Sequence, residues 1–269
     1  MKPIPVAGPS VSCLMVTRDR LALAARAIKC FADQRYPARE LVIVTQGGSD
    51  YRCHLAGVVR QHEIANVVIL DADPDLRLGA LRNRSLDAAS GELVCVWDDD
   101  DCSHPDRLAI HVAQLIEDGS HSSFLSEHLQ LFTSDRTLYW IDWDLGMPRA
   151  RYPLLPGTML MTHDRRFRYP ESGRYAHFGE DWALLTELHR QVPVSYLRGQ
   201  GQLYLYTYHG GNSFSAVHHA KLRIRARTAA AIAEQELRIR AAIANFTVSG
   251  PIRVHGSDGP AFSIEKGAA

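Results

Sequence analysis

Four consecutive aspartates at residues 98–101 directly follow an apolar run at 92–97 that indicates a buried strand. Adjacent carboxylates repel one another, so such a run costs stability unless a cation offsets its charge. Asp98 and Asp100 can point to the same side of an extended chain, and carboxylate oxygens suit Mg²⁺ or Mn²⁺. The run therefore predicts a divalent-cation site. The alternative is a solvated acidic loop that caps the helix beginning near Pro105.

The spacing of other residues excludes two related kinds of site. An EF-hand calcium loop starting at Asp98 would need glycine and glutamate where the chain has Ser103 and Ala109. The sequence also contains neither G-x-G-x-x-G nor G-x-x-x-x-G-K-[ST], so no glycine-rich phosphate loop is indicated. A metal site of this kind suits a substrate with a diphosphate, whose charge the metal would neutralise.

Alternating strand and helix patterns must position the aspartate run. Short apolar runs predict buried strands, and the segments between them have apolar residues at helical spacing. The strands are expected at 11–17, 40–45, 67–70 and 92–97, and the helices at 21–34, 52–62 and 78–89. This order predicts an α/β fold, a Rossmann-like, mostly parallel sheet flanked by helices. Thr17, Thr45 and Asp98 end three of the strands, where such sheets bind ligands.

The pattern changes after residue 120. Two strand-like runs lie within 124–143, and a helix at 178–192 opens with two acidic residues. A tyrosine-rich strand is expected at 204–208. Residues 216–245 indicate one long, arginine-rich helix, followed by a loop-like tail.

Composition is that of an ordinary folded protein. The 269 residues include 30 Lys+Arg and 30 Asp+Glu, so net charge gives no support to a nucleic-acid partner. The N-terminus lacks a signal-peptide pattern, and no apolar run approaches the ~20 residues that cross a bilayer. The five cysteines include no pair with the C-x-x-C spacing of a zinc or redox site. We expect a cytoplasmic protein, with peripheral contact at the inner face of the membrane left open.

Several segments resemble family 2 glycosyltransferases of the GT-A fold in their order and spacing. These segments are residues 11–20, 40–50, 78–84, 89–92, 97–108, 179–182 and 209–213. The aspartate run alone is a weak signal, but its combination with Arg82-Asn83 and Glu180-Asp181 is specific. The resemblance covers most of the chain to about residue 215.

The resemblance implies which residues bind the donor. Thr17 and Arg18 would line the nucleobase pocket, and Arg82 would reach the base or the phosphates. The resemblance also implies that Asp99 is one of the donor-binding residues. Thr45 stands where the family commonly has the first aspartate of an Asp-Asp-Gly sequence that contacts the base.

The resemblance also implies metal ligands and a catalytic base. Asp98, near the ribose and the metal, and Asp100, on the metal, would form the Asp-x-Asp element of the family. His209 would approach the metal and the diphosphate from a later loop. Asp181 would be the general base, with Glu180 beside it. On the residues alone, the acidic pair could instead complement a helix dipole, and His209 could be a surface loop residue.

The implied activity is that of a metal-dependent, inverting glycosyltransferase of the hexosyltransferase type. It would use Mn²⁺ or Mg²⁺ to move a sugar from a nucleotide diphosphate donor, UDP-sugar first, to a hydroxyl of a saccharide, a lipid-linked glycan or a protein. Residues 1–120 would bind the nucleotide-sugar, and 121–215 would form the acceptor-binding and catalytic half of the same domain. Residues 216–269 would form a C-terminal helix and tail, available to a membrane or to a second copy in a homo-oligomer.

Two other functions stay open at this point. A sugar nucleotidyltransferase is also α/β and metal-dependent, but it usually has a glycine-rich, basic loop after the first strand, and residues 17–20 contain no glycine. A non-catalytic nucleotide-sugar-binding module would bind the donor without turnover. Release of free nucleoside diphosphate distinguishes these functions from the transferase.

Overall fold

The computed structural model describes residues 8–146, 150–176, 179–248 and 250–265, which form two compact units that alternate along the sequence. The first unit comprises Met1–Asp100, Leu108–Phe124 and Pro156–Ser195. The second comprises Asp101–Arg107, Leu125–Leu155 and Tyr196–Ala269. Neither unit is therefore a single contiguous segment of the chain.

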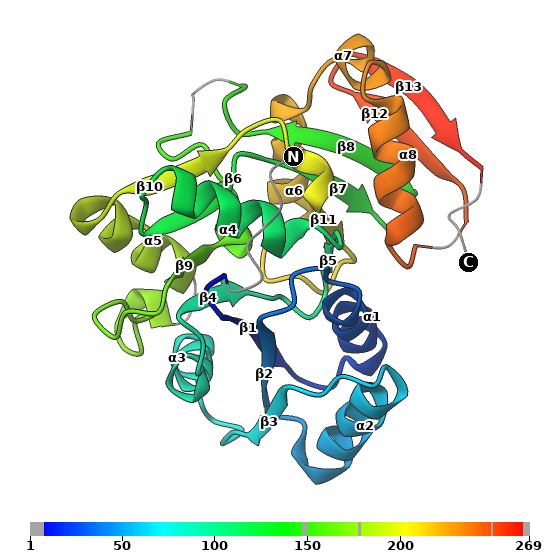
Figure 1. Ribbon diagram of the computed structural model, residues 1–269. Helices are drawn as coiled ribbons and strands as arrows, with labels where there is room; N and C mark the ends of the chain where they lie inside the picture. The colour runs from blue at the N-terminus through cyan, green and yellow to red at the C-terminus, as the bar shows by residue number, and fades with distance from the viewer. Residues whose placement is uncertain (1–7, 147–149, 177–178, 249, 266–269) are drawn as a thin grey trace. The chain divides into compact units, whose positions relative to one another are not determined.

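The sheet of the first unit has seven strands in the order β10-β6-β9-β4-β1-β2-β3 (Figure 1). They are β1 (Val11–Thr17), β2 (Arg39–Thr45), β3 (Val67–Asp71), β4 (Leu93–Val96), β6 (Ser122–Leu125), β9 (Leu160–Thr162) and β10 (Val194–Leu197). The first four strands run parallel to their neighbours among themselves, and β9 runs antiparallel to β4 and β6. The predicted α/β fold is confirmed, and the apolar runs of β1, β2 and β4 are buried as expected. Strand β3 was predicted to be buried, but it lies at the sheet edge and has no buried residue.

The helices of this unit fix the start of the aspartate run. They are α1 (Leu21–Ala32), α2 (Gly48–Gln61), α3 (Leu78–Ala88), α4 (Arg107–Glu117) and α5 (Glu180–Gln191), with short 3₁₀ turns η1 (Pro156–Thr158) and η2 (Arg174–Ala176). Helix α1 buries Ala27 and Phe31 on its apolar face. Trp97 packs edge-on against Phe31 with 5.9 Å between ring centroids, and its indole N–H donates to the Ala27 carbonyl at 3.0 Å. The residue before Asp98 is thus anchored to α1.

Helix α3 lies tightly against the segment that follows β9. A Cβ added at Gly79 would come within 2.2 Å of the Pro170 carbonyl oxygen, so a larger residue would push the two segments apart. Asn83 donates to the Tyr169 carbonyl at 2.8 Å and accepts from the Tyr169 amide at 2.9 Å. These contacts hold the helix that carries Arg82 against a buried aromatic ring.

The sheet of the second unit has six strands in the order β13-β12-β8-β7-β11-β5. They are β5 (Cys102–Ser103), β7 (Glu127–Phe132), β8 (Thr137–Asp142), β11 (Tyr204–Tyr208), β12 (Ile252–Gly256) and β13 (Gly259–Ile264), with the 3₁₀ turn η3 (Gly201–Leu203) before β11. Strand β11 runs parallel to β7 and antiparallel to β5. This arrangement makes β5, which directly follows Asp101, an edge strand next to β11.

The loop-like tail expected at the C-terminus is wrong. Strands β12 and β13 form an antiparallel hairpin that closes at the pair Gly256 and Gly259, and β12 adds in parallel to β8. Ile252 and Val254 are buried on alternate positions, which is the period of a strand with one covered face. That alternation was the sequence signal for strand β12, but it consists of only two apolar residues.

The prediction of one long helix over residues 216–245 is also wrong. Residues 216–245 form α6 (Ala216–Leu222), the 3₁₀ turn η4 (Arg223–Arg225), α7 (Ala229–Ala233) and α8 (Glu236–Asn245). Ala226 is extended and bridges Ile141 on β8, and the Arg227 amide donates to the Trp140 carbonyl at 3.0 Å. Tertiary pairing with β8 thus overrides helix propensity. No helix among the described residues is long and apolar enough to cross a membrane.

Alternate arginines of this interrupted segment pack on aromatic side chains of the second unit. The pairs are Arg223 over Phe132 and Tyr139, Arg225 over Trp143, and Arg227 over Trp140, with 4.4–5.5 Å from guanidinium carbon to ring centroid. Arg227 also forms ion pairs with Glu127 at 3.0 Å and Asp142 at 3.2 Å. These cations are part of the packing of the second unit and do not form an exposed basic helix face.

Candidate active site

The aspartate run alternates between partly exposed and buried side chains. Asp98 and Asp100 keep 25% and 15% of their side-chain surface exposed, whereas Asp99 and Asp101 are 2% and 5% exposed. The alternation arises in a turn at residues 99–100, although the sequence predicted it for an extended chain. The four aspartates therefore have different surroundings, and two of them are partly exposed.

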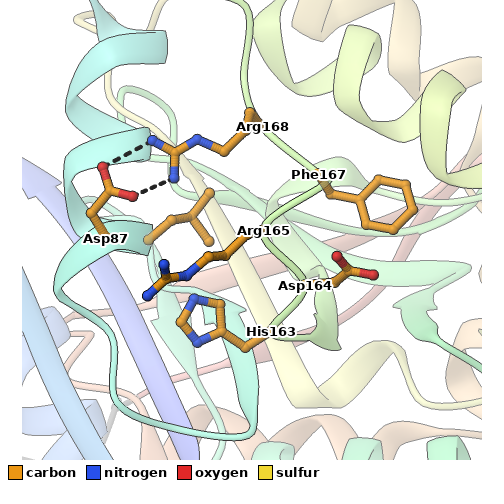
Figure 2. Close-up of a pocket in the computed structure, with 7 residues that line it drawn as sticks. Asp87, His163, Asp164, Arg165, Phe167 and Arg168 are labelled. Atoms are coloured by element: carbon orange, nitrogen blue, oxygen red, sulfur yellow. Dashed lines mark hydrogen bonds and ion pairs between the residues drawn. The ribbon is translucent and has the colours of Figure 1, made fainter.

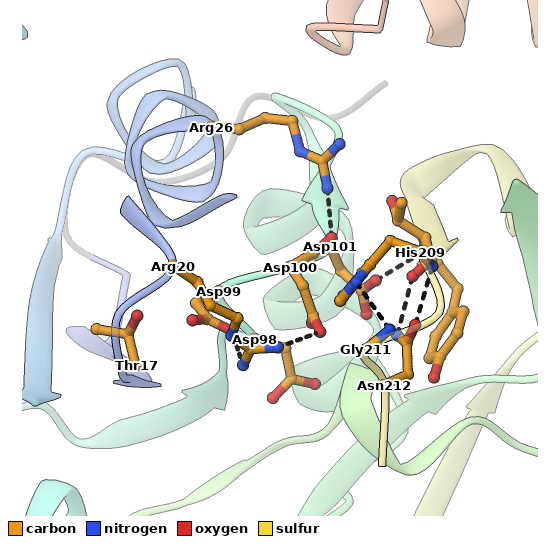
Figure 3. A network of polar contacts seen from close by, with 12 residues as sticks. Thr17, Arg20, Arg26, Asp98, Asp99, Asp100, Asp101, His209, Gly211 and Asn212 are labelled. Atoms are coloured by element: carbon orange, nitrogen blue, oxygen red, sulfur yellow. Dashed lines mark hydrogen bonds and ion pairs between the residues drawn. The ribbon is translucent and has the colours of Figure 1, made fainter. Parts of the chain in front are cut away.

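Arg20 holds the middle of the run within the first unit (Figure 3). Its guanidinium donates to Asp99 at 2.7 Å and to Asp100 at 3.1 Å, and Arg26 donates to the backbone carbonyl of Asp100. Burial and the neighbouring charge of Asp100 raise the pKa of Asp99 to about 6, although Arg20 and Thr17 act against this shift. Arg20 was not among the residues predicted from the sequence, because it lies some 80 positions away from its partners.

Arg82 joins the aspartate run to helix α5. Its Nη2 lies 3.1 Å from Asp98 and its Nε lies 3.2 Å from Glu180, while the guanidinium packs on the Tyr169 ring at 5.6 Å. Burial alone would lower the pKa of Arg82, but the charges of Asp98 and Glu180 raise it above the usual value. The side chain is thus a permanent cation between two acidic groups, and a role on the base or phosphates stays a prediction.

Asp181 and Glu180 stand in the first turn of α5, after Gly179 with a φ of +80°. Burial, followed by the charge of Glu180, raises the pKa of Asp181 to about 6. One Asp181 oxygen accepts the Trp182 amide at 2.7 Å, so the residue also satisfies a helix N-terminal donor. A carboxyl whose pKa lies near 6 is well matched to accept a proton near neutral pH.

The residues predicted around the nucleobase differ in exposure. Thr17 is buried and its hydroxyl lies 2.7 Å from the Tyr51 hydroxyl, and Thr45 is fully buried and accepts the Gly47 amide at 3.1 Å. Arg18 is exposed and lies 3.7 Å from Asp19. Their contacts with a donor stay predictions. Tyr51, which sequence reasoning missed, orders the loop after β1 through Thr17.

His209 lies in the second unit, on the loop that follows β11. Its Nδ1 accepts the Gly211 amide at 3.3 Å, and its backbone amide donates to the Asn212 side chain at 2.9 Å (Figure 3). The described residues contain no group of three or more His, Cys, Asp and Glu side chains that could hold a metal by themselves. Its role as a metal ligand therefore stays a prediction.

A small pocket elsewhere in the first unit contains none of the predicted site residues. It is lined by Leu86, Asp87, His163, Asp164, Arg165, Phe167 and Arg168 (Figure 2). Arg168 pairs with both Asp87 oxygens, at 2.5 and 2.9 Å. This pairing ties the end of α3 to the segment after β9.

The family model described as Glycosyl transferase family 2 matches residues 12–144. WcaA of Escherichia coli, assigned to colanic acid biosynthesis as a glycosyl transferase, is 29% identical over 149 residues, which are 55% of this chain and 50% of WcaA. EpsE of Bacillus subtilis, named as a glycosyltransferase, is 29% identical over 40% of this chain and 39% of its own. The chain thus spans half or less of the length of these relatives.

Solved structures show the same fold. TarS of S. aureus in complex with UDP-GlcNAc aligns with a TM-score of 0.60 and 18% identity, over 89% of this chain and 68% of the TarS chain. A mannosyltransferase from Pyrobaculum calidifontis, in complex with GDP-Man and Mn²⁺, aligns with a TM-score of 0.57 and 15% identity, over 89% and 65%. Residues 12–144 are therefore similar in sequence to family 2 glycosyltransferases, and the chain shares the fold of the solved glycosyltransferase structures.

Proposed function

We propose that the protein transfers a sugar from a nucleotide diphosphate donor to a hydroxyl acceptor, with inversion at the anomeric carbon. One observation carries the proposal: Arg82 joins Asp98 of the aspartate run to the acidic pair of α5 within one unit. The donor class is supported by solved structures of the same fold that contain UDP-GlcNAc or GDP-Man. The pKa of Asp181, which burial and the charge of Glu180 raise to about 6, supports an active site over a binding module.

The proposed reaction is a single displacement. The acceptor oxygen forms a bond to the anomeric carbon while the bond from that carbon to the donor diphosphate breaks, so the configuration inverts. The acceptor O–H bond breaks in the same step, and Asp181 takes the proton. Glu180, held by Arg82 at 3.2 Å, fixes the first turn of α5 and with it the position of Asp181.

The residues present fit a divalent cation. A cation that is bound together with a diphosphate needs only one or two protein carboxylates, and Asp98 and Asp100 are the two partly exposed members of the run. When bound, the cation would neutralise the leaving diphosphate. Arg20 and Arg82 would orient the two carboxylates, and His209 would supply a nitrogen ligand.

Nucleotide binding should depend on the cation. We expect UDP to bind more tightly in Mn²⁺ or Mg²⁺ than in EDTA, and Asp100→Ala to remove this gain, because the variant loses a carboxylate ligand. Isothermal titration calorimetry measures both affinities. Asp33→Ala is the matched control, since Asp33 is an exposed acid paired with Lys29 at the far end of α1. Equal wild-type affinity with and without the cation would contradict the metal-dependent mechanism.

Uridine is the nucleobase that we propose for the donor. The support is the UDP-GlcNAc complex of TarS, which has the same fold. The end of β2 differs from the family pattern, because Thr45 is buried and Gln46 donates to the Asp73 and Leu76 carbonyls at 2.8 and 3.0 Å. In a thermal-shift series with Mn²⁺, UDP should raise the melting temperature more than GDP or dTDP at equal concentration. A larger shift with GDP or dTDP would replace uridine in the proposal.

A further inference from the structure

Asp101, the last residue of the aspartate run, has both carboxylate oxygens engaged within the second unit. One oxygen accepts the Tyr204 hydroxyl at 2.6 Å and the other accepts the Thr207 amide at 2.8 Å. The side chain is 5% exposed. Both partners lie on β11, so Asp101 faces this strand and is not available to a cation or a donor.

The contacts continue from Thr207 to the loop that carries His209. The Asn212 side chain donates to the Thr207 carbonyl at 3.0 Å and accepts the His209 amide at 2.9 Å. Gly210, with a φ of +86°, allows the tight turn that places Asn212 back over the strand. The backbone of Thr207 therefore connects the two side chains, because its amide donates to Asp101 and its carbonyl accepts from Asn212.

A carboxylate suits this position better than a neutral side chain. The Thr207 amide can only donate, and the Tyr204 hydroxyl donates to the second oxygen, so Asp101 meets two donors at once. Hydrogen bonds to an ionised acceptor are stronger than those between neutral groups. Arg107 packs on the Tyr204 ring at 4.8 Å and limits its movement.

We propose that Asp101 is a positioning residue that fixes the His209 loop to the end of the aspartate run. The carboxylate acts through Thr207 and Asn212, and the residue before it in the chain is Asp100. This inference rests on the proposed function, because His209 is given a role toward the cation and diphosphate there. It assigns Asp101 a task that differs from that of Asp98 and Asp100.

Hydrogen exchange tests the positioning without any ligand. In Asp101→Ala and in the shape-conserving Asp101→Asn, the amides of 207–212 should exchange faster than in the wild type, while the amides of β12 and β13 keep their rates. The control is Asp142→Ala, which removes another buried carboxylate of the same sheet. Asp142 accepts from Arg227 and the Asp144 amide, and it lies on β8, which β7 separates from β11. Unchanged protection of 207–212 in both Asp101 variants would overturn the proposal.

Calorimetry of UDP with and without Mn²⁺ then tests the consequence. Asp101→Asn should lose at most the roughly 10- to 100-fold of metal-dependent affinity that loss of a direct partner of a metal ligand costs, with UDP affinity in EDTA unchanged. The double variant with His209→Ala should bind no more weakly than His209→Ala alone, because both changes act through one group. Additive losses would overturn the inference. A wild type without any metal-dependent gain would instead overturn the proposed function, and the exchange rates would still decide the positioning role.

Discussion

Asp181→Asn is expected to reduce sugar transfer by about 10²–10⁴-fold while nucleotide and cation still bind, because the variant keeps the shape of the side chain and loses its basicity. An acceptor hydroxyl is a poor nucleophile until its proton can leave, and Asp181 is the carboxyl on α5 whose pKa lies near 6. Released nucleoside diphosphate, measured with an acceptor panel, gives the rate. Near-normal turnover of the variant would show that the base lies elsewhere, with Glu180 the next candidate.

The pH dependence supplies a control for this prediction. A base must be ionised, so the wild-type rate should fall by about tenfold for each pH unit below the Asp181 pKa of about 6. The residual rate of Asp181→Asn should lack this decline. Asp99 has a pKa of about 6 as well, so Asp99→Asn must retain the decline if Asp181 alone is responsible for it.

The same substitution should stabilise the metal-free protein. The folded-state pKa of Asp181 is raised from 3.8 to about 6, so the stability linked to its proton is present below about pH 4 and is lost as pH rises through 6. At pH 8 the buried, ionised carboxyl then costs up to about 3 kcal/mol. Asp181→Asn removes that cost, and its melting temperature at pH 8 should exceed that of the wild type.

Arg227→Met is expected to lower the free energy of unfolding of the second unit by about 3–5 kcal/mol, because it leaves buried acid without its counter-charge. Glu127 is 3% exposed, and although it still accepts from the Trp140 indole and the Gly199 amide, its charge would be unpaired. Urea unfolding followed by tryptophan fluorescence measures the change. Arg238→Met, at an exposed position of α8, should cost about 0.5 kcal/mol or less.

A loss below about 1 kcal/mol for Arg227→Met would show that water or another group compensates the charge of Glu127.

The expected loss of stability also affects how peripheral membrane contact, which stays a prediction, can be tested. Charge reversal at Arg223, Arg225 and Arg227 would remove aromatic stacking and ion pairs together, so a loss of liposome binding would report unfolding. Lys221, an exposed residue of α6, is the better position for such a test.

The elements that the sequence predicts well are those with a strong local pattern. The buried parallel strands are continuous apolar runs, and β1, β2 and β4 were found where those runs lie. The interruption at Ala226 could not be predicted in this way. It depends on pairing with Ile141, 85 positions earlier, and the local residues favour a helix.

The site shows the same limit. Spacing indicated that Asp98 and Asp100 share a side, which stays a prediction; the structure shows that they are the two partly exposed members of the run. Spacing could not show that Asp99 and Asp101 have different partners. Those partners are Arg20 and Tyr204, which come from distant parts of the chain. Charge repulsion among four aspartates is therefore offset in two ways, by arginines and by hydrogen-bond donors on β11.

The alternation of the two units along the chain affects how the protein can be synthesised. When a ribosome has released only the first 150 residues, β1 to β4 exist but β9, which pairs with β4, does not. The second sheet is also incomplete at that stage, because β11 lies between β5 and β7. The first core therefore cannot close before Ser195 has emerged, and the second cannot close before β13 has emerged. Nascent chains should depend on protection of these open strand edges.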